Sequence, residues 1–150
     1  MPTAIPRSST SRSLDSERAY FGELEGVPRF ERDQETELAR AVVGTRRAYW
    51  TTLVSPTHLR TAIAAIVRHA SDEEVRRLAR DVRGLLDRDA GDGPESAVAA
   101  LVDALVKAGD QHAAADAVVA VAAGVDARWH ADAVEARAVF LAARNRFVRA

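Results

Sequence analysis

Cysteine is absent from the 150-residue sequence, which excludes disulfide bonds, thiolate metal sites and cysteine nucleophiles. Apolar stretches long enough to cross a bilayer are absent as well, because the longest, from Ala113 to Val125, is interrupted by Asp116 and Gly124. The first 14 residues contain no continuous apolar segment after their positive charges, so they lack the pattern of a secretory signal. We therefore predict a soluble, cytoplasmic chain that has no membrane partner.

Catalytic motifs are also lacking. The sequence contains no HExxH, no GxGxxG, no Walker ending and no GxSxG. His112 and Asp116 are four residues apart, as are Asp126 and His130, and such pairs on one helix face can form half of a metal site. Surface ion pairs with this spacing are commoner in helices rich in aspartate. The sequence therefore predicts no enzyme, no catalytic residue, no metal site, no cofactor and no small-molecule substrate.

Charge is balanced overall but not along the chain. The net charge of −1 combines a basic start over residues 1–14, an acidic stretch over residues 87–136 and a basic end over residues 137–150, which has four arginines and no acid. Solvated helix faces commonly produce such blocks. A polyanion-binding element beside a segment that does not bind polyanions produces them too. Charge alone leaves both interpretations open.

Helical periodicity is present in almost every segment after residue 14, and alanine, leucine and arginine are strong helix formers. Residues 1–14 are rich in serine and proline, which predicts a disordered tail. The pattern gives no convincing strand, and helices are expected to begin near residues 15, 32, 56, 71, 94, 110 and 126. The predicted fold class is therefore all-α, a multi-helix bundle of about six or seven helices with a disordered N-terminal tail.

Capping and punctuation residues set the expected helix boundaries. They are Gly26 and Pro28 after the first helix, Ser55 with Pro56 before the third, Ser71 with Glu74 as a capping box before the fourth, Pro94 and Gly109 at the two ends of the fifth, and Asp110 before the sixth. The last helix has its apolar residues at spacings of three and four, among them Trp129, Phe140 and Phe147.

One segment, residues 15–44, carries a more specific pattern. It resembles region 1.2 of bacterial sigma-70 family factors, in which an Asp-Pro-x-Arg-x-Tyr-Leu-x-Glu-Ile-Gly start leads through a Leu-Leu pair into an acidic Glu-Glu-Glu-x-x-Leu-Ala helix. The residues that match this pattern are Asp15, Arg18, Tyr20, Glu23, Leu24, Gly26, Val27, Pro28, Glu35, Glu37, Leu38, Ala39 and Gly44. The resemblance implies a transcription initiation factor.

The opposite end of the sequence adds a second match in family order. Residues 143–150 read Ala-Arg-Asn-Arg-Phe-Val-Arg-Ala and resemble the opening of sigma region 2.1, which continues in the family with Asn-Leu-Arg-Leu-Val. In the family, the segment between these regions is variable and largely helical. The resemblance divides the chain into a disordered tail (1–14), a region 1.2-like segment (15–55), a variable helical segment (56–136) and the start of a region 2-like helix (137–150).

The resemblance also implies partners and a nucleic-acid site. Sigma factors direct RNA polymerase core to promoter DNA, and their region 1.2 lies against region 2 and contacts the non-template single strand downstream of the minus-ten element. Carried over to this sequence, Arg18 can meet a phosphate, Tyr20 and Phe21 offer flat surfaces to an unpaired base, and Gly22 lies beside them.

The family's principal polymerase contact, promoter melting and minus-35 recognition reside in region 2 and region 4, which the 150 residues largely lack. We therefore expect the N-terminal portion of a sigma factor, which does not direct initiation by itself and in which Phe140 and Phe147 are exposed. An alternative is a stand-alone helical regulator that binds RNA polymerase or a sigma partner, with residues 87–136 as a docking or DNA-mimicking face. A third alternative is an enzyme with a histidine–carboxylate metal site.

Overall fold

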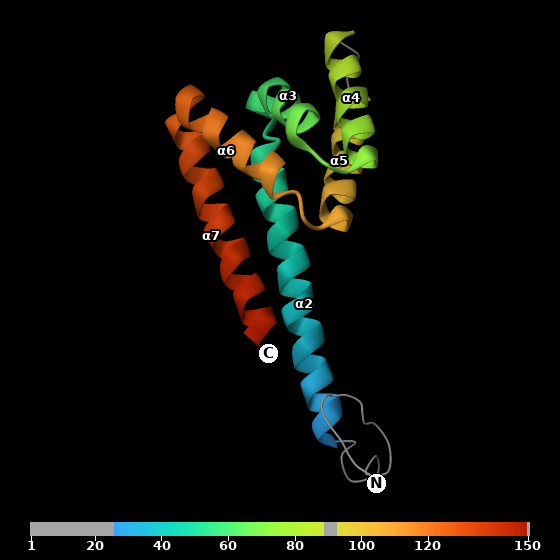
Figure 1. The fold of residues 1–150 in the computed structure, drawn as a ribbon, viewed down its shortest axis with the longest axis vertical. Coiled ribbons are helices and arrows are strands. Elements are labelled where there is room, and N and C mark those ends of the chain that lie inside the picture. The colour runs from blue at the N-terminus through green and yellow to red at the C-terminus, as the bar shows by residue number, and fades with distance from the viewer. Residues whose placement is uncertain (1–25, 89–92, 150) are drawn as a thin grey trace. The chain divides into compact units, whose positions relative to one another are not determined.

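The computed structural model describes residues 26–88 and 93–149, and this part of the chain consists of helices and the short connections between them, without a strand (Figure 1). Its elements are α2 (Gly26–Leu53), a short 3-10 helix η1 (Pro56–His58), α3 (Leu59–His69), α4 (Glu73–Asp87), α5 (Gly93–Ala108), α6 (His112–Val125) and α7 (Ala127–Arg149). The predicted all-α class is confirmed. The expected tail over residues 1–14 and the expected helix from residue 15 lie outside the described residues.

Helix α2 begins six residues earlier than the sequence pattern predicts. We expected Gly26 and Pro28 to separate two helices and the second to start near Arg32, and this expectation is wrong, because the helix already begins at Gly26. Proline has no backbone N–H, but the first four N–H groups of a helix have no intrahelical partner in any case. Pro28 in the first turn therefore interrupts no hydrogen bond.

The N-terminus of α4 is capped by a different residue from the one predicted. Asp72, rather than Ser71, is the N-cap, and its carboxylate accepts a 3.0 Å hydrogen bond from the backbone N–H of Val75. Aspartate is at least as good an N-cap as serine, so the cap moves one residue along the chain. Glu74 does not complete a capping box but forms an ion pair with Arg77 at 2.8 Å.

The connection between α5 and α6 follows the predicted punctuation closely. Helix α5 ends at Ala108, and Gly109 follows with φ of +84°, a left-handed conformation that glycine adopts without the steric cost of a Cβ atom. Gln111, rather than the expected Asp110, occupies the N-cap position of α6, but its side chain makes no capping hydrogen bond. The carboxylate of Asp110 still accepts a long 3.4 Å hydrogen bond from the backbone N–H of His112.

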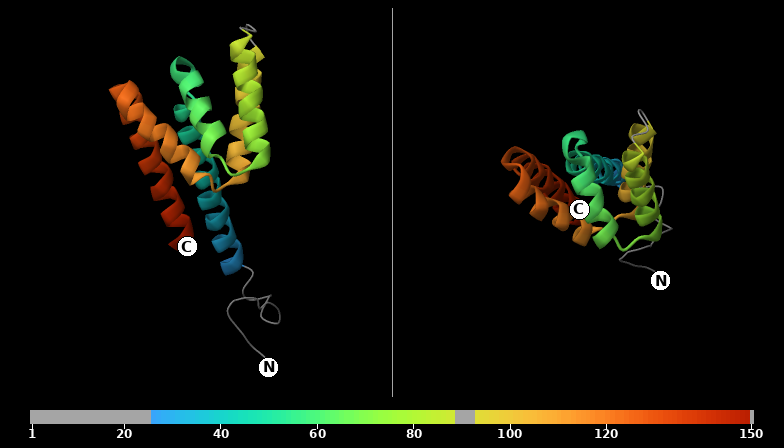
Figure 2. Two further views of the ribbon diagram at one scale, coloured as in Figure 1. Left: turned by 45° about the horizontal axis from the view of Figure 1, so that its top comes forward. Right: turned by 90° about the horizontal axis from the view of Figure 1, so that it is seen from above.

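Residues 39–150 form one compact unit with one hydrophobic core. In this unit α3 packs against both α4 and α6, α5 packs against α4, and α7 packs against α6 (Figure 2). The largest fully buried side chains are Leu53, Ile63, Ile66, Val75, Val82, Leu101, Leu105 and Val118. Alanines contribute many of the other core positions, including Ala62 on α3 and Ala114 on α6, both fully buried.

Only some of the aromatic side chains of α7 are buried. Phe140 is 6% exposed and belongs to the core, so the expectation that it is exposed is wrong, whereas Phe147 is 41% exposed, as expected. The aromatic ring of Tyr49 on α2 covers Phe140, a contact that a sequence pattern on α7 alone does not contain. Among the described residues, no helix is both long and apolar enough to span a membrane.

Candidate functional site

The predicted DNA-contacting residues Arg18, Tyr20, Phe21 and Gly22 lie outside the described residues, so their role stays a prediction. The structure does describe part of each sequence match. Residues 26–44 of the first match belong to α2, and residues 143–149 of the second belong to α7. The candidate site is therefore built from the packing of α2 on α7 within residues 39–150.

We call the contact between residues 46–52 of α2 and residues 129–144 of α7 the α2–α7 seam. The two helices run antiparallel here (Figure 1). Tyr49 stacks on Phe140 with ring centroids 6.1 Å apart, and the indole Nε1 of Trp129 donates a 3.1 Å hydrogen bond to the backbone oxygen of Thr52. The last turn of α2 has carbonyls without intrahelical partners, and Trp129 satisfies one of them.

A histidine–aspartate pair lies at one end of the seam. The Nε2 atom of His58 is 2.8 Å from Oδ2 of Asp126, and the imidazole ring stacks on Trp129 with centroids 4.4 Å apart and planes 13° apart. An ionised carboxylate can only accept, so Nε2 carries the proton. These residues border an open cavity of about 480 Å³. The hydrogen bond from His58 to Asp126 thereby holds the imidazole ring in place over the indole of Trp129.

Asp126 is also the residue at which α6 ends and α7 begins. Its Oδ1 atom accepts hydrogen bonds from the backbone N–H groups of Arg128 at 2.9 Å and Trp129 at 3.3 Å. The hydrogen bond from His58, followed by the one from the Trp129 backbone, holds the pKa of the Asp126 carboxyl below its ordinary value, while desolvation opposes the shift. The carboxylate is therefore favoured in its ionised form.

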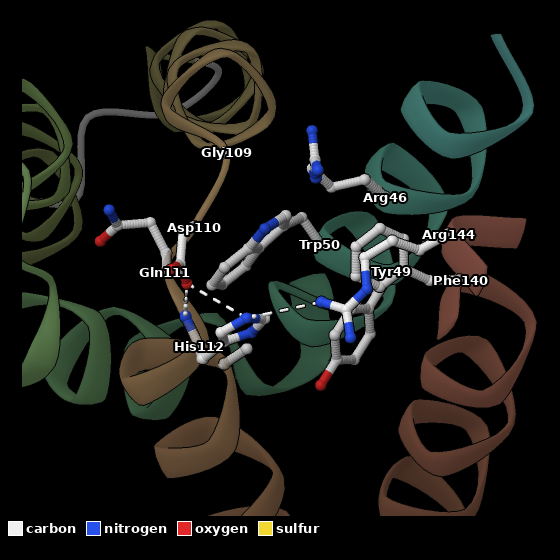
Figure 3. Close-up of a pocket in the computed structure, with 10 residues that line it drawn as sticks. Arg46, Tyr49, Trp50, Gly109, Asp110, Gln111, His112, Phe140 and Arg144 are labelled. Carbon is white, nitrogen blue, oxygen red and sulfur yellow. Dashed lines mark hydrogen bonds and ion pairs between the residues drawn. The ribbon is translucent and has the colours of Figure 1, made fainter. Parts of the chain in front are cut away.

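A second cavity, of about 240 Å³, lies beside the seam between α2, α7 and the start of α6, and we call it the arginine pocket (Figure 3). Arg46 and Arg144 both direct their guanidinium groups over the ring of Phe140, at 5.3 and 5.7 Å from its centroid. Asp110 and His112 line the opposite side. Guanidinium groups over an aromatic face are held by the ring quadrupole.

Neither arginine of this pocket is paired with a carboxylate among the described residues. Arg46 donates only a long 3.4 Å hydrogen bond to the backbone oxygen of Val106, and its Nε atom is buried without a hydrogen-bond partner. Nη1 of Arg144 is 3.5 Å from Nε2 of His112, and the same Nε2 is 3.2 Å from Oδ1 of Asp110. A pocket with two uncompensated guanidinium groups attracts anions.

Comparison of the chain with protein-family models, curated proteins and solved structures finds no match. The sigma-factor resemblance thus stays a prediction from the residues quoted above.

The two histidine–aspartate pairs proposed from sequence spacing do not form. His112 contacts Asp110 instead of Asp116, and Asp116 lies 3.9 Å from Arg137. The carboxylate of Asp126 turns to His58 instead of His130. Within residues 26–88 and 93–149 the structure places no group of three or more potential ligands around one point.

Sequence reasoning also missed both sites that the structure assembles. His58 and Asp126 are 68 positions apart, and Arg46 and Arg144 are 98 positions apart. The only local signal was Asp126 itself, because an aspartate directly before an apolar helical pattern predicts an N-cap. Nothing in the sequence indicates which distant side chain shares that carboxylate.

Proposed function

We propose that this chain supplies region 1.2 and the start of region 2.1 of a sigma-70 family transcription initiation factor. In this role it helps RNA polymerase core engage promoter DNA, and residues 15–44 contact the non-template single strand downstream of the minus-ten element. The proposed DNA contacts are Arg18, Tyr20, Phe21 and Gly22.

The observation that carries this proposal is the α2–α7 seam. The two sequence matches are about a hundred residues apart, and they fall on two helices that pack on each other through the Tyr49–Phe140 stack. In the sigma-70 family, region 1.2 lies against region 2. A seam between α2 and α7 is the packing that such an assignment requires.

The proposed DNA contact is one of charge and stacking rather than base readout. Arg18 supplies a cation for a phosphate, and a flat aromatic side chain supplies a surface for an unpaired base. Tyr20 and Phe21 are adjacent and therefore diverge by about 100° on a helix, so only one of them faces the DNA. We assign the stacking role to Tyr20, because it matches the tyrosine of the family pattern.

The test grafts residues 15–44 in place of region 1.2 of a sigma-70 factor with a known promoter and measures the lifetime of open complexes after addition of a competitor. The grafted factor is expected to form open complexes. Tyr20→Ala should shorten their lifetime by about tenfold, which corresponds to the loss of one base–aromatic stack. Arg18→Ala should also shorten it and should weaken the salt dependence.

Arg29→Ala is the matched control for Arg18→Ala, because it removes an arginine of the same segment that lies outside the predicted contacts. The control is expected to leave the lifetime unchanged. Failure of the grafted factor to open the promoter, or equal lifetimes for Arg18→Ala and Arg29→Ala, contradicts the proposal.

The compact unit formed by residues 39–150 favours one alternative, a stand-alone helical regulator of polymerase or of a sigma partner. Its proposed docking face, the acidic residues 87–136, is partly neutralised within the molecule. Three of its acids form ion pairs with neighbouring elements, Asp87 with Arg60, Asp103 with Arg47 and Asp116 with Arg137, and Asp126 accepts a hydrogen bond from His58. Gel filtration of the chain with core polymerase and, separately, with a sigma factor distinguishes the regulator from the sigma-factor portion. A regulator is expected to form a stable complex with core polymerase or with the sigma factor in the absence of promoter DNA.

A further inference from the structure

We propose that the arginine pocket is a binding site for a phosphate group. The proposal concerns Arg46, Arg144 and His112, all within residues 39–150, and it does not depend on the sigma-factor assignment.

The charges of the pocket are not balanced. Two guanidinium groups face one carboxylate, that of Asp110, and this carboxylate contacts His112 rather than either arginine. Several other arginines of the described chain do reach a carboxylate. They are Arg47, Arg60, Arg76, Arg77 and Arg137. Other arginines without a carboxylate partner, such as Arg40, Arg68 and Arg80, are exposed to solvent. Arg46 and Arg144 differ from them because both are half-buried and line a cavity.

The hydrogen bonding of the pocket is also incomplete. Nε2 of His112 lies between Asp110 and Nη1 of Arg144, and it cannot donate to the carboxylate and accept from the guanidinium at the same time. The buried Nε atom of Arg46 has no partner at all. A buried donor without a partner is unfavourable. An anion between the two arginines accepts from Arg144, and a rotation of Arg46 towards it exposes the unpaired N–H group to the same ligand.

The shape of the pocket selects a compact anion. Tyr49, Trp50 and Phe140 line it, but each is at most 6% exposed, so their faces have no room for a stacked base. The volume of about 240 Å³ accommodates a small group. Phosphate offers more acceptor oxygens than a carboxylate and matches the several fixed donors of two guanidinium forks.

The test titrates inorganic phosphate into the full chain and follows the backbone amide signals by NMR, with chloride adjusted to keep the ionic strength constant. Saturable shifts are expected at Gly109, Asp110 and His112. Arg144→Gln should raise the dissociation constant by about tenfold, the effect of losing a charge-assisted hydrogen bond. Arg144→Lys, which keeps the charge but not the fork, should recover part of the affinity.

Arg146→Gln is the matched control, because Arg146 is an exposed arginine two residues along the same helix and does not line the pocket. Its effect should stay within about twofold, since screening weakens a charge at that distance. Shifts that do not saturate, or equal losses for Arg144→Gln and Arg146→Gln, overturn the proposal. Arg46→Gln provides a second pocket variant if Arg144→Gln does not fold.

Two further titrations distinguish the source of the phosphate. A nucleoside monophosphate carries a free terminal phosphate, and a short single-stranded oligothymidylate without terminal phosphates carries only backbone diesters. Tighter binding of the first assigns the pocket to a small phosphorylated molecule, and tighter binding of the second assigns it to a nucleic-acid backbone. If neither ligand shifts Gly109, Asp110 and His112, or if Arg144→Gln leaves the dissociation constant of the ligand that binds unchanged, the proposal is wrong.

Discussion

Asp126 links three helices through its own atoms. Its backbone N–H donates to Ala122 at the end of α6, its Oδ1 atom caps α7, and its Oδ2 atom binds His58 next to the start of α3. Each hydrogen bond is ordinary by itself. Because they share one residue, a change at Asp126 affects all three elements together.

The lowered pKa of Asp126 predicts how stability changes with pH. A carboxyl whose pKa is lower in the folded state stabilises the fold when it is ionised. This contribution is complete above the unfolded pKa of about 3.9 and is lost as the pH falls through the lower folded value. Urea unfolding at a series of pH values should therefore show a smaller loss of stability between about pH 4.5 and pH 2 for Asp126→Asn than for the original protein.

Asp132→Asn is the control for this measurement, since Asp132 borders the same cavity but is exposed. It should follow the pH dependence of the original protein. An identical pH dependence for Asp126→Asn would show that the hydrogen bonds to Asp126 do not favour its ionised form.

At the scale of elements, Gln111 connects two loops that are distant in sequence. It is 7% exposed, its Oε1 atom accepts a 3.1 Å hydrogen bond from the backbone N–H of Ser71, and its Nε2 atom donates to the Ser71 hydroxyl at 3.3 Å. The amide thereby ties the α5–α6 connection to the α3–α4 connection. Both ends of the glutamine side chain are satisfied, which is what burial of a polar group requires.

Gln111→Leu should lower the free energy of unfolding by about 1–2 kcal/mol, because the N–H group of Ser71 loses its partner. Gln34→Leu is the matched control, since Gln34 is exposed on α2 and should change stability by less than about 0.5 kcal/mol. Chemical denaturation with unchanged m-values measures both. Equal effects of the two substitutions would contradict a role for this hydrogen-bonded pair.

The elements that the sequence predicts best are those bounded by local signals. Pro94 and Gly109 place α5 within one residue, because a helix start and a left-handed glycine depend only on neighbouring residues. The same local reasoning misplaced the start of α2, because Pro28 is tolerated in the first turn of a helix, and the cap of α4, because Ser71 and the adjacent Asp72 could serve equally well. The resemblance implies that α2 packs on α7. The residues that make this contact, the His58–Asp126 pair and the arginine pocket were not predictable, because each joins residues that only the packed helices bring together.

At the scale of the whole molecule, the core of residues 39–150 depends on small side chains. Ala62 and Ala114 are fully buried on α3 and α6, two helices that pack against each other. Such interiors are close to maximal density and have no space for additional methylene groups. A larger side chain at Ala62 or Ala114 is therefore expected to destabilise the fold.

Ala114→Leu should destabilise the protein by about 1–3 kcal/mol through overpacking. Ala113→Leu is the control one position away, where the side chain is exposed and leucine retains good helix propensity. Thermal unfolding followed by circular dichroism compares the two. A melting temperature for Ala114→Leu equal to that of Ala113→Leu would mean that the α3–α6 interface accommodates the larger side chain without loss of stability.

The α2–α7 seam also has a consequence for the order in which the chain folds. Most contacts of α3, α4, α5 and α6 join helices close in sequence, whereas the bond from Trp129 to Thr52 spans 77 residues. Long-range contacts form slowly, because their loop must close first, and α7 is synthesised after α2 to α6. We expect folding to proceed from the middle helices outward. Residues 46–52 of α2 and their partners on α7 then meet only after the helices between them have packed.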